Sequence, residues 1–298
     1  MNRFTIALLG TAIAFLLAVE AVSIWGFDRT SKVQRREVAQ RQTLLAVEDT
    51  NSSAPPHIAV LGNSLMLDGV NVQILTAQTC NKAVPVPYFV LGTYYYDWYF
   101  GLKRLFAEGM RPRYVLLGLS PNHFVSSHTR GEYSARYLFR RQDLIEVGQK
   151  THMDATTASS FMLANISEYY STRQITRGYI LGRVFPSVSE LLHNKLGVSR
   201  DLAIPETTIK TLARERLTAM DALCRANGAQ FILVVPPSYQ SGAEVVGQVG
   251  KDLGIPVLIP VTGDQLDQSF YQSDGFHLNE KGADIFTNKL AADLQHLL

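Results

Sequence analysis

The chain has 298 residues, of which 46% are hydrophobic and 18% are charged, and its formal net charge is +2. This composition is typical of a globular core with an added apolar segment, and it excludes an intrinsically disordered chain. Phosphate binding needs a concentrated basic face, and no long basic run follows residue 42, so nucleic acid is not expected as the main partner.

The N-terminal segment is predicted to be a membrane anchor. Residues 4–27 are mostly apolar and carry one charge, Glu20, and these 24 residues are enough to span a bilayer with some tilt. A cleaved signal peptide would need small residues after a shorter apolar run, and Ala18 and Ala21 provide only a weak version of that site. The pattern favours an uncleaved signal anchor over a cleaved signal peptide, and a buried core helix is a further alternative that this length disfavours.

Residues 28–56 are polar and charged and are predicted to form a stalk and a linker, followed by a folded domain over residues 57–298. The segment after the span carries several basic residues: Arg29, Lys32, Arg35, Arg36 and Arg41. Counted literally, the positive-inside rule would put the folded domain in the cytoplasm. Long domains, however, translocate largely regardless of charge.

Short apolar runs in the folded domain predict buried strands. The runs are bounded by Gly or Pro and cover residues 57–61, 88–91, 114–119, 230–235 and 256–259. None alternates polar with apolar residues, which is typical of a parallel sheet covered on both faces. Helical patterns lie between or after them at residues 96–109, 209–227, 244–253 and 280–297.

This alternation predicts an α/β domain, a doubly wound three-layer α/β/α fold with a mostly parallel sheet. Residues 123–207 interrupt the alternation and are rich in Tyr and Arg, so they are predicted to form a helical insertion or cap.

A candidate nucleophile follows the first predicted strand, which runs straight into Gly62-Asn63-Ser64-Leu65. Ligands of open α/β sheets bind at the carboxyl ends of the strands, so Ser64 is well placed, although such a serine is more often only a helix cap. Asp274 and His277 lie three residues apart before the last helix, as the orienting acid and the base of a serine nucleophile would. For this fragment alone, a surface turn is an equally fair interpretation.

These two blocks together resemble the SGNH (GDSL-like) hydrolases over residues 57–126 and 209–298. The resemblance implies that Ser64 is the nucleophile and that Asp274 and His277 complete the triad. It further implies an oxyanion hole that includes the N–H of Gly92 and the side chain of Asn122. Two departures stand out: Asn63 replaces the commoner Asp, and Ser-Pro-Asn-His-Phe at residues 120–124 replaces the usual Gly-x-Asn-Asp block.

The third block and the apolar N-terminus are similar to the membrane-anchored branch of that family. This branch includes proteins of alginate O-acetylation and the D-alanine-transfer protein of teichoic-acid assembly. The resemblance implies an O-acyltransferase of the inner (cytoplasmic) membrane, with a single span and its catalytic domain in the periplasm. It would transfer acetyl groups through an acyl-serine to a cell-surface polysaccharide. A membrane-bound O-acyltransferase partner would supply the acetyl groups. The alternatives are a carbohydrate or lipid esterase of the same mechanism, a lipid esterase facing the cytoplasm, and a non-catalytic glycan-assembly subunit.

Several further residues have two interpretations. The aromatic run at residues 94–99 could stack on a sugar or belong to the core, and His123 and His128 could line the site or be ordinary loop residues. The insertion arginines could meet an anionic polymer or form a solvated face: Arg130, Arg136, Arg140 and Arg141. Cys80 and Cys224 could pair or be small buried residues, and no histidine has metal-ligand spacing, so neither metal nor cofactor is expected.

Overall fold

The computed structural model describes residues 2–49, 54–184, 204–238 and 241–298. The chain divides into two compact units, which we call the helical unit (Met1–Val38 and Gly131–Leu196) and the sheet unit (Ala39–Arg130 and Gly197–Leu298). The predicted stalk, residues 28–56, is therefore divided between the units. Parts of the predicted linker and insertion, residues 51–53 and 185–203, lie outside the described residues.

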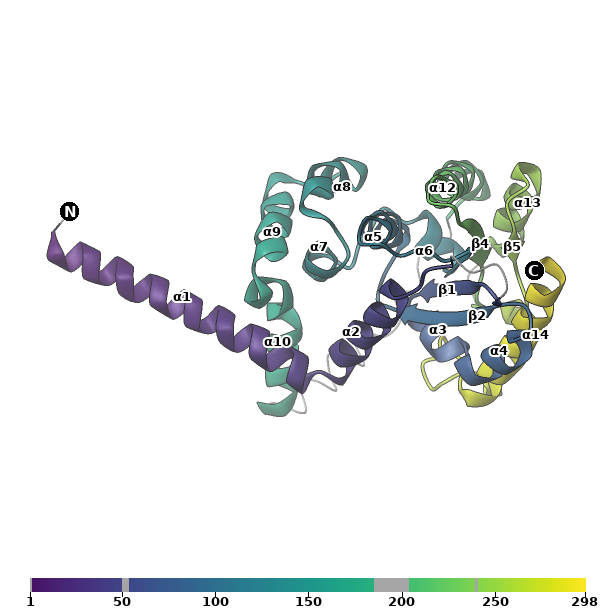
Figure 1. Cartoon of the computed structure of the whole chain (residues 1–298), viewed down its shortest axis with the longest axis horizontal. Helices are drawn as coiled ribbons and strands as arrows, with labels where there is room; N and C mark the ends of the chain where they lie inside the picture. The colour runs from purple at the N-terminus through teal and green to yellow at the C-terminus, as the bar shows by residue number, and fades with distance from the viewer. Residues whose placement is uncertain (1, 50–53, 185–203, 239–240) are drawn as a thin grey trace. The chain divides into compact units, whose positions relative to one another are not determined.

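The sheet unit contains a five-stranded parallel sheet with the strand order β2-β1-β3-β4-β5 (Figure 1). Its strands are β1 (His57–Gly62), β2 (Val84–Phe89), β3 (Tyr114–Gly118), β4 (Gln230–Val234) and β5 (Val257–Leu258). Every neighbouring pair is parallel, which confirms the predicted α/β class and parallel sheet. The order reverses between β1 and β3, and ligands of such sheets bind at this switch point.

Strand β2 differs most from its prediction, since it covers Val84–Phe89 where residues 88–91 were expected. Pro85 and Pro87 argue against a strand because proline cannot donate a hydrogen bond to a neighbour. Both are tolerated because β2 lies at the edge of the sheet and pairs only with β1. The backbone N–H of Phe89 donates to the side chain of Gln40 at 3.1 Å.

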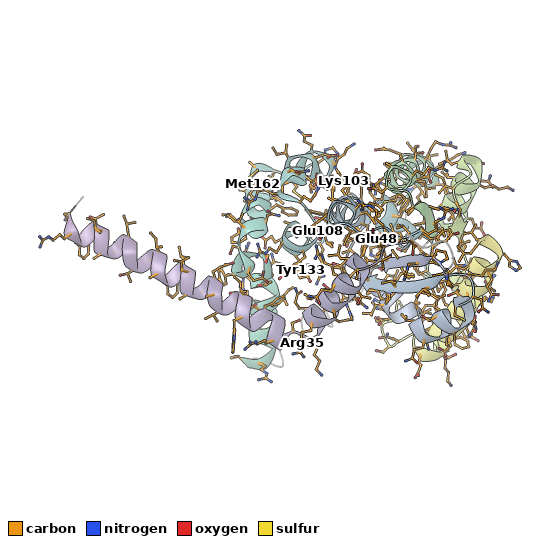
Figure 2. The ribbon with its side chains drawn as sticks, viewed as in Figure 1. Arg35, Glu48, Lys103, Glu108, Tyr133 and Met162 are labelled. Carbon is orange, nitrogen blue, oxygen red and sulfur yellow. The ribbon has the colours of Figure 1, made fainter. Side chains whose placement is uncertain are left out.

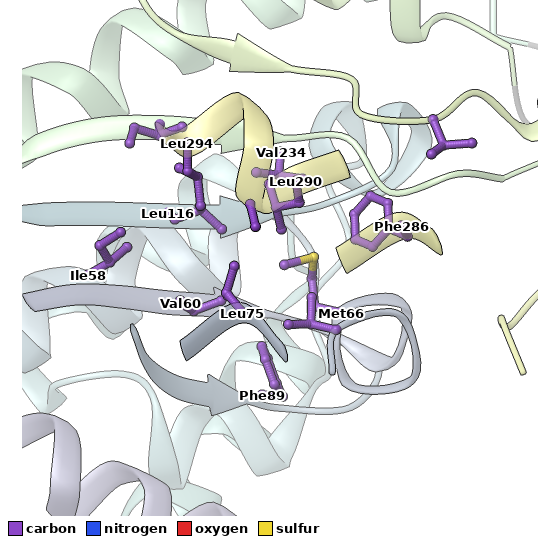
Figure 3. Close-up of a cluster of buried hydrophobic side chains, with 14 of the residues drawn as sticks. Ile58, Val60, Met66, Leu75, Phe89, Leu116, Val234, Phe286, Leu290 and Leu294 are labelled. Carbon is purple, nitrogen blue, oxygen red and sulfur yellow. The ribbon is translucent and has the colours of Figure 1, made fainter. Parts of the chain in front are cut away.

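Helices cover both faces of the sheet (Figure 1). One face carries α3 (Ser64–Gly69), α4 (Val72–Thr79) and α14 (Glu280–Leu297), and the other carries α5 (Tyr95–Ala107), α12 (Glu206–Ala226) and α13 (Ala243–Leu253). Figure 3 shows the core under α14, where Phe286, Leu290 and Leu294 pack against alternate residues of the strands, such as Ile58 and Val60. Alternate side chains of buried strands point to opposite faces, so each strand serves both layers.

A pair of glycines lets α3 approach the sheet closely. Gly62 and Gly118 are partners at the ends of β1 and β3. A β-carbon on Gly118 would lie 2.0 Å from the sulfur of Met66, and one on Gly62 would lie 2.3 Å from its Cγ. Met66 is fully buried on α3, so these glycines hold the first turn of α3 against the strand ends.

The predicted stalk does not stand free of the folded parts. After α1 (Arg3–Thr30), α2 (Lys32–Leu45) buries Leu44, and Val47 is buried beyond it. The carboxylate of Asp49 then accepts the backbone N–H groups of His57 and Arg113, both at 2.8 Å, which joins this segment to the sheet.

The helical unit consists of α1, the first part of α2, and the segment that interrupts the sheet unit. This segment forms α7 (Glu132–Tyr137), a short turn at Arg141–Asp143, α8 (Leu144–Lys150), α9 (Ala155–Ile166) and α10 (Glu168–Val184). The stretch Arg3–Phe27 of α1 is long and apolar enough to cross a membrane, and its side chains project outwards in Figure 2.

Candidate active site

Ser64 is the first residue of α3, directly after β1, and is half-buried. The helix begins here because Asn63 caps it: the side-chain oxygen of Asn63 accepts the backbone N–H of Leu65 at 3.0 Å. The sequence therefore places the hydroxyl of Ser64 at the carboxyl edge of the sheet, beside the switch point between β1 and β3.

Asn63 also joins Ser64 to the loop that carries Gly92. Its side-chain nitrogen donates to the carbonyl of Thr93 at 3.1 Å, and the residue is only 1% exposed. The hydroxyl of Thr93 in turn donates to the carbonyl of Val90 at 2.7 Å and accepts the indole N–H of Trp98 at 2.9 Å. Asparagine at position 63 thus has a structural role, since a carboxylate could not donate to Thr93.

The loop before α14 folds Asp274 and His277 towards each other. The backbone N–H of Gln272 donates to the carbonyl of His277 at 2.7 Å, and Gly275 takes a left-handed conformation with φ of 68°. Asn279 ends the loop by capping α14, because its side-chain oxygen accepts the N–H of Gly282 at 3.1 Å.

The three predicted triad residues form one hydrogen-bonded chain. The Nε2 atom of His277 lies 2.8 Å from the hydroxyl of Ser64, and its Nδ1 atom lies 2.6 Å from Asp274 Oδ2. The other oxygen of Asp274 accepts the backbone N–H groups of Phe276 and His277 at 2.9 and 3.0 Å. This is the nucleophile, base and orienting acid arrangement expected of a serine acyl-transfer site.

The environment of Asp274 favours its ionised form. Partial burial opposes ionisation, but the hydrogen bonds from the His277 ring and from two backbone N–H groups outweigh it and lower the pKa of Asp274. An ionised Asp274 holds the imidazole with Nδ1 protonated, which leaves Nε2 to accept the proton of Ser64.

Gly92 follows β2 and has a φ of 66°, a conformation that other residues rarely adopt. A β-carbon there would meet only the Cγ of Arg130, at 3.9 Å, so the backbone conformation rather than space requires glycine. Within the described part of the chain, the backbone N–H groups of Ser64 and Gly92 donate to no protein acceptor. The oxyanion role of these groups stays a prediction.

Asn122 lies in the first turn of α6 (Pro121–Val125), just beyond β3. Because β3 neighbours β1, Asn122 and Ser64 follow the two strands on either side of the switch point. Among the described residues, no hydrogen bond joins the Asn122 amide to Ser64 or His277. Its role as an oxyanion donor stays a prediction.

An aromatic cluster extends from the triad, and we call its members Phe276, His123, Tyr94 and His128 the aromatic wall. The ring of Phe276 lies 5.0 Å from that of His277 and 6.4 Å from that of His123. Tyr94 lies 5.0 Å from His123 and 6.0 Å from His128. The motif pattern missed Phe276, although its place directly before His277 in the sequence is a signal that could have identified it.

The core interpretation of the aromatic run is confirmed for most of its residues, and the sugar-stacking interpretation stays a prediction for Tyr94. Tyr95, Tyr96 and Trp98 are buried at 3%, 8% and 0% exposure and belong to the core of the sheet unit, whereas Tyr94 is half-exposed in the aromatic wall. Its position is held by Asp97, which is fully buried and whose carboxylate accepts the Tyr94 N–H at 2.8 Å.

The four arginines have different environments. Arg130 lies beside Gly92 in the sheet unit. In the helical unit, Arg136 pairs with Glu168 at 3.2 Å, and Arg140 pairs with Asp143 at 2.6 Å. Internal pairing therefore accounts for two of these arginines without an anionic polymer.

Cys80 is exposed and Cys224 is buried, and they are not paired with each other. Burial raises the pKa of the Cys224 thiol, as expected of an inert core cysteine. No group of three or more potential metal ligands occurs among the described residues.

A cavity of about 590 Å³ lies at the carboxyl ends of β4 and β5, between Pro236, Gly242 and Thr262. None of the triad residues lines it.

Comparison of the chain with protein-family models and with curated protein sequences found no match.

Proposed function

We propose that the protein is a membrane-anchored serine acyltransferase of the SGNH type that moves an acyl group, most simply acetyl, to a cell-surface polysaccharide. The observation that carries this proposal is the hydrogen-bonded chain from Ser64 through His277 to Asp274, at 2.8 and 2.6 Å. His277 lies 213 residues after Ser64 and three residues after Asp274, and the three side chains meet in the order that nucleophilic catalysis requires.

The first half-reaction forms an acyl-serine. The hydroxyl of Ser64 attacks the carbonyl carbon of the acyl donor while Nε2 of His277 accepts its proton. The resulting oxyanion is stabilised by the N–H groups of Ser64 and Gly92 and by the Asn122 amide, and donors of this kind are worth about 3–4 kcal/mol each. The tetrahedral intermediate then breaks its bond to the leaving group, which takes the proton from His277.

The second half-reaction transfers the acyl group from Ser64. His277 accepts a proton from the attacking hydroxyl, the new ester bond forms, and the bond to Ser64 breaks as His277 returns the proton to Ser64. A sugar hydroxyl as acceptor gives transfer, and water gives hydrolysis. The aromatic wall supports a ring-shaped acceptor, since an aromatic side chain beside the base, such as Phe276, can stack on a sugar ring.

A chemical test uses an activated acetyl ester, with intact mass and ester turnover as readouts. We expect an acetyl adduct on the wild-type chain, none on Ser64→Ala, and turnover lowered by at least about 10³-fold in that variant. Ser159→Ala, at an exposed serine of α9, is the matched control and should behave as wild type. Equal adduct or turnover in Ser64→Ala would refute the mechanism, and inactivity of the wild-type chain would favour the non-catalytic glycan-assembly alternative.

We further propose a single-span topology in the inner membrane with the sheet unit in the periplasm. The basic residues after the span argue against export, but two of them pair with acidic side chains of the protein: Arg36 with Glu37 at 3.5 Å, and Arg41 with Glu108. Long domains translocate largely regardless of charge, so the export proposal rests on the size of the folded domain and not on these pairs. A reporter fused after Leu298 tests this: alkaline phosphatase activity is expected, whereas fluorescence of a cytoplasmic reporter would support the esterase that faces the cytoplasm.

By resemblance, we propose that a membrane-bound O-acyltransferase partner delivers the acyl donor to Ser64. Co-purification with a multi-span acyltransferase encoded beside polysaccharide-synthesis genes would support this partner. Full transfer activity of the isolated chain with a soluble acetyl donor would contradict the need for it.

A further inference from the structure

The acidic residue inside the apolar span has specific partners in the helical unit. The carboxylate of Glu20 accepts the hydroxyl of Ser167 at 2.7 Å, the backbone N–H of Tyr169 at 3.2 Å, and the backbone N–H of Glu168. Ser167 precedes α10, so Glu20 satisfies N–H groups at the start of that helix, which has 17 residues. These bonds fix the junction of α9 and α10 to one position along α1.

The position of Glu20 along α1 gives the depth of this junction. Glu20 lies 16 residues after Phe4, a rise of about 24 Å along an α-helix, and the hydrocarbon core of a bilayer is about 30 Å thick. The apolar stretch continues to Phe27. If Phe4 lies at the far boundary of the hydrocarbon, Glu20 lies about 6 Å inside the near boundary. The junction that it holds then reaches the same depth.

The side chains around this junction match that depth. Four large residues at the end of α9 and the start of α10, which we call the apolar corner, are exposed: Met162 (51%), Leu163 (47%), Ile166 (56%) and Tyr169 (46%). In the view of Figure 2, Met162 lies on the side of α9 toward which α1 extends. The other end of α9 is polar and exposed, with Asp154 as its cap and Thr156 in its first turn.

We propose that the apolar corner is a second membrane contact, immersed in the near interface of the bilayer that α1 spans. Lipid is the favoured occupant because Glu20 ties the corner to α1 at the depth where the headgroups meet the hydrocarbon. Tyr169 fits this place, since tyrosine is enriched at membrane interfaces, where its ring is buried and its hydroxyl is hydrated. The contact would hold the helical unit against the membrane. It does not depend on whether the sheet unit lies in the cytoplasm or in the periplasm.

The test measures lipid contact at two positions of α9 in the full-length protein in nanodiscs. Single cysteines are introduced by Ile166→Cys and Thr156→Cys in a Cys80→Ser background, since Cys224 is fully buried, and are labelled with an environment-sensitive fluorophore. Quenching by lipids with brominated acyl chains is expected to be at least about threefold stronger at position 166 than at position 156. Equal, weak quenching at both positions would overturn the proposal.

A second measurement tests whether the hydrogen bonds of Glu20 hold the apolar corner at the membrane. Glu20→Ala should lower lipid quenching at position 166 at least about twofold, because the junction is no longer tied to α1. Thr11→Ala is the matched control, since its hydroxyl donates within α1, to the carbonyl of Ala7 at 3.0 Å. Unchanged quenching in Glu20→Ala would refute the proposal that Glu20 holds the apolar corner at the membrane. A label at position 166 that is shielded from water but not quenched by lipid would assign the corner to a protein partner and overturn the membrane contact.

Discussion

Replacement of Asn63 by alanine should both destabilise the protein and impair the candidate active site. Asn63 is 1% exposed, caps α3 through Leu65 N–H and donates to the carbonyl of Thr93. Loss of a helix cap costs about 1 kcal/mol, and a buried carbonyl left without its donor costs about 1–3 kcal/mol. The free energy of unfolding should therefore fall by about 2–4 kcal/mol, as measured by denaturant unfolding.

Asn71 is the matched control. It caps α4 through Ile74 N–H at 3.3 Å, and its amide donates to Asp284 at 2.9 Å, so it makes the same two kinds of bond away from the triad. We expect Asn71→Ala to lose stability while kcat for an activated acetyl ester stays within about twofold. Asn63→Ala should lower kcat by at least about tenfold, because the loop that carries Gly92 loses its tie to the Ser64 turn. Equal kcat values in the two variants would refute this reasoning.

Three further predictions concern the same site. Gly92→Ala should lose about 1–2 kcal/mol of unfolding free energy, because φ is 66° at this position. In steady-state kinetics it should lower kcat with little change in KM. An unchanged kcat would argue against an oxyanion role. Asp274 has a lowered pKa in the folded protein, so its contribution to stability is present above the unfolded value of about 3.9 and is lost as the pH falls through the folded value. The stability difference between wild type and Asp274→Asn, from thermal unfolding, should therefore be constant above about pH 5 and shrink below about pH 4; a difference that grows in acid would contradict the sign. Phe276→Leu should reduce kcat/KM for transfer to an oligosaccharide by about two- to tenfold and leave hydrolysis of a small ester unchanged, and equal losses in both assays would remove the sugar-stacking role.

Local patterns in the sequence predicted much of the sheet unit. Apolar runs bounded by Gly or Pro predicted β1, β3, β4 and β5 near their observed places, because a run buried on both faces has few alternatives to a parallel strand. The run at β2 was misplaced because Pro85 and Pro87 disfavour a strand, and only the strand order shows that β2 is an edge where proline is tolerated.

The candidate site divides in the same way. The sequence by itself determined that Ser64 follows a strand and that Asp274 and His277 share one short loop, because strand ends, caps and turns depend on neighbouring residues. Tertiary structure decided the rest: the 2.8 Å contact of His277 with Ser64, the bond from Asn63 to Thr93, and the role of Phe276 in the aromatic wall.

The N-terminus follows the same division. Hydropathy alone predicted a helix that can cross a membrane, but Glu20 was only an unexplained charge in it until its bonds with Ser167 and the start of α10 were known. The physical reason is common to both regions. A pattern along the chain fixes the conformation of a few consecutive residues, whereas contacts between remote side chains depend on how whole helices and strands pack, which is decided by the sum of many weak interactions over the entire fold.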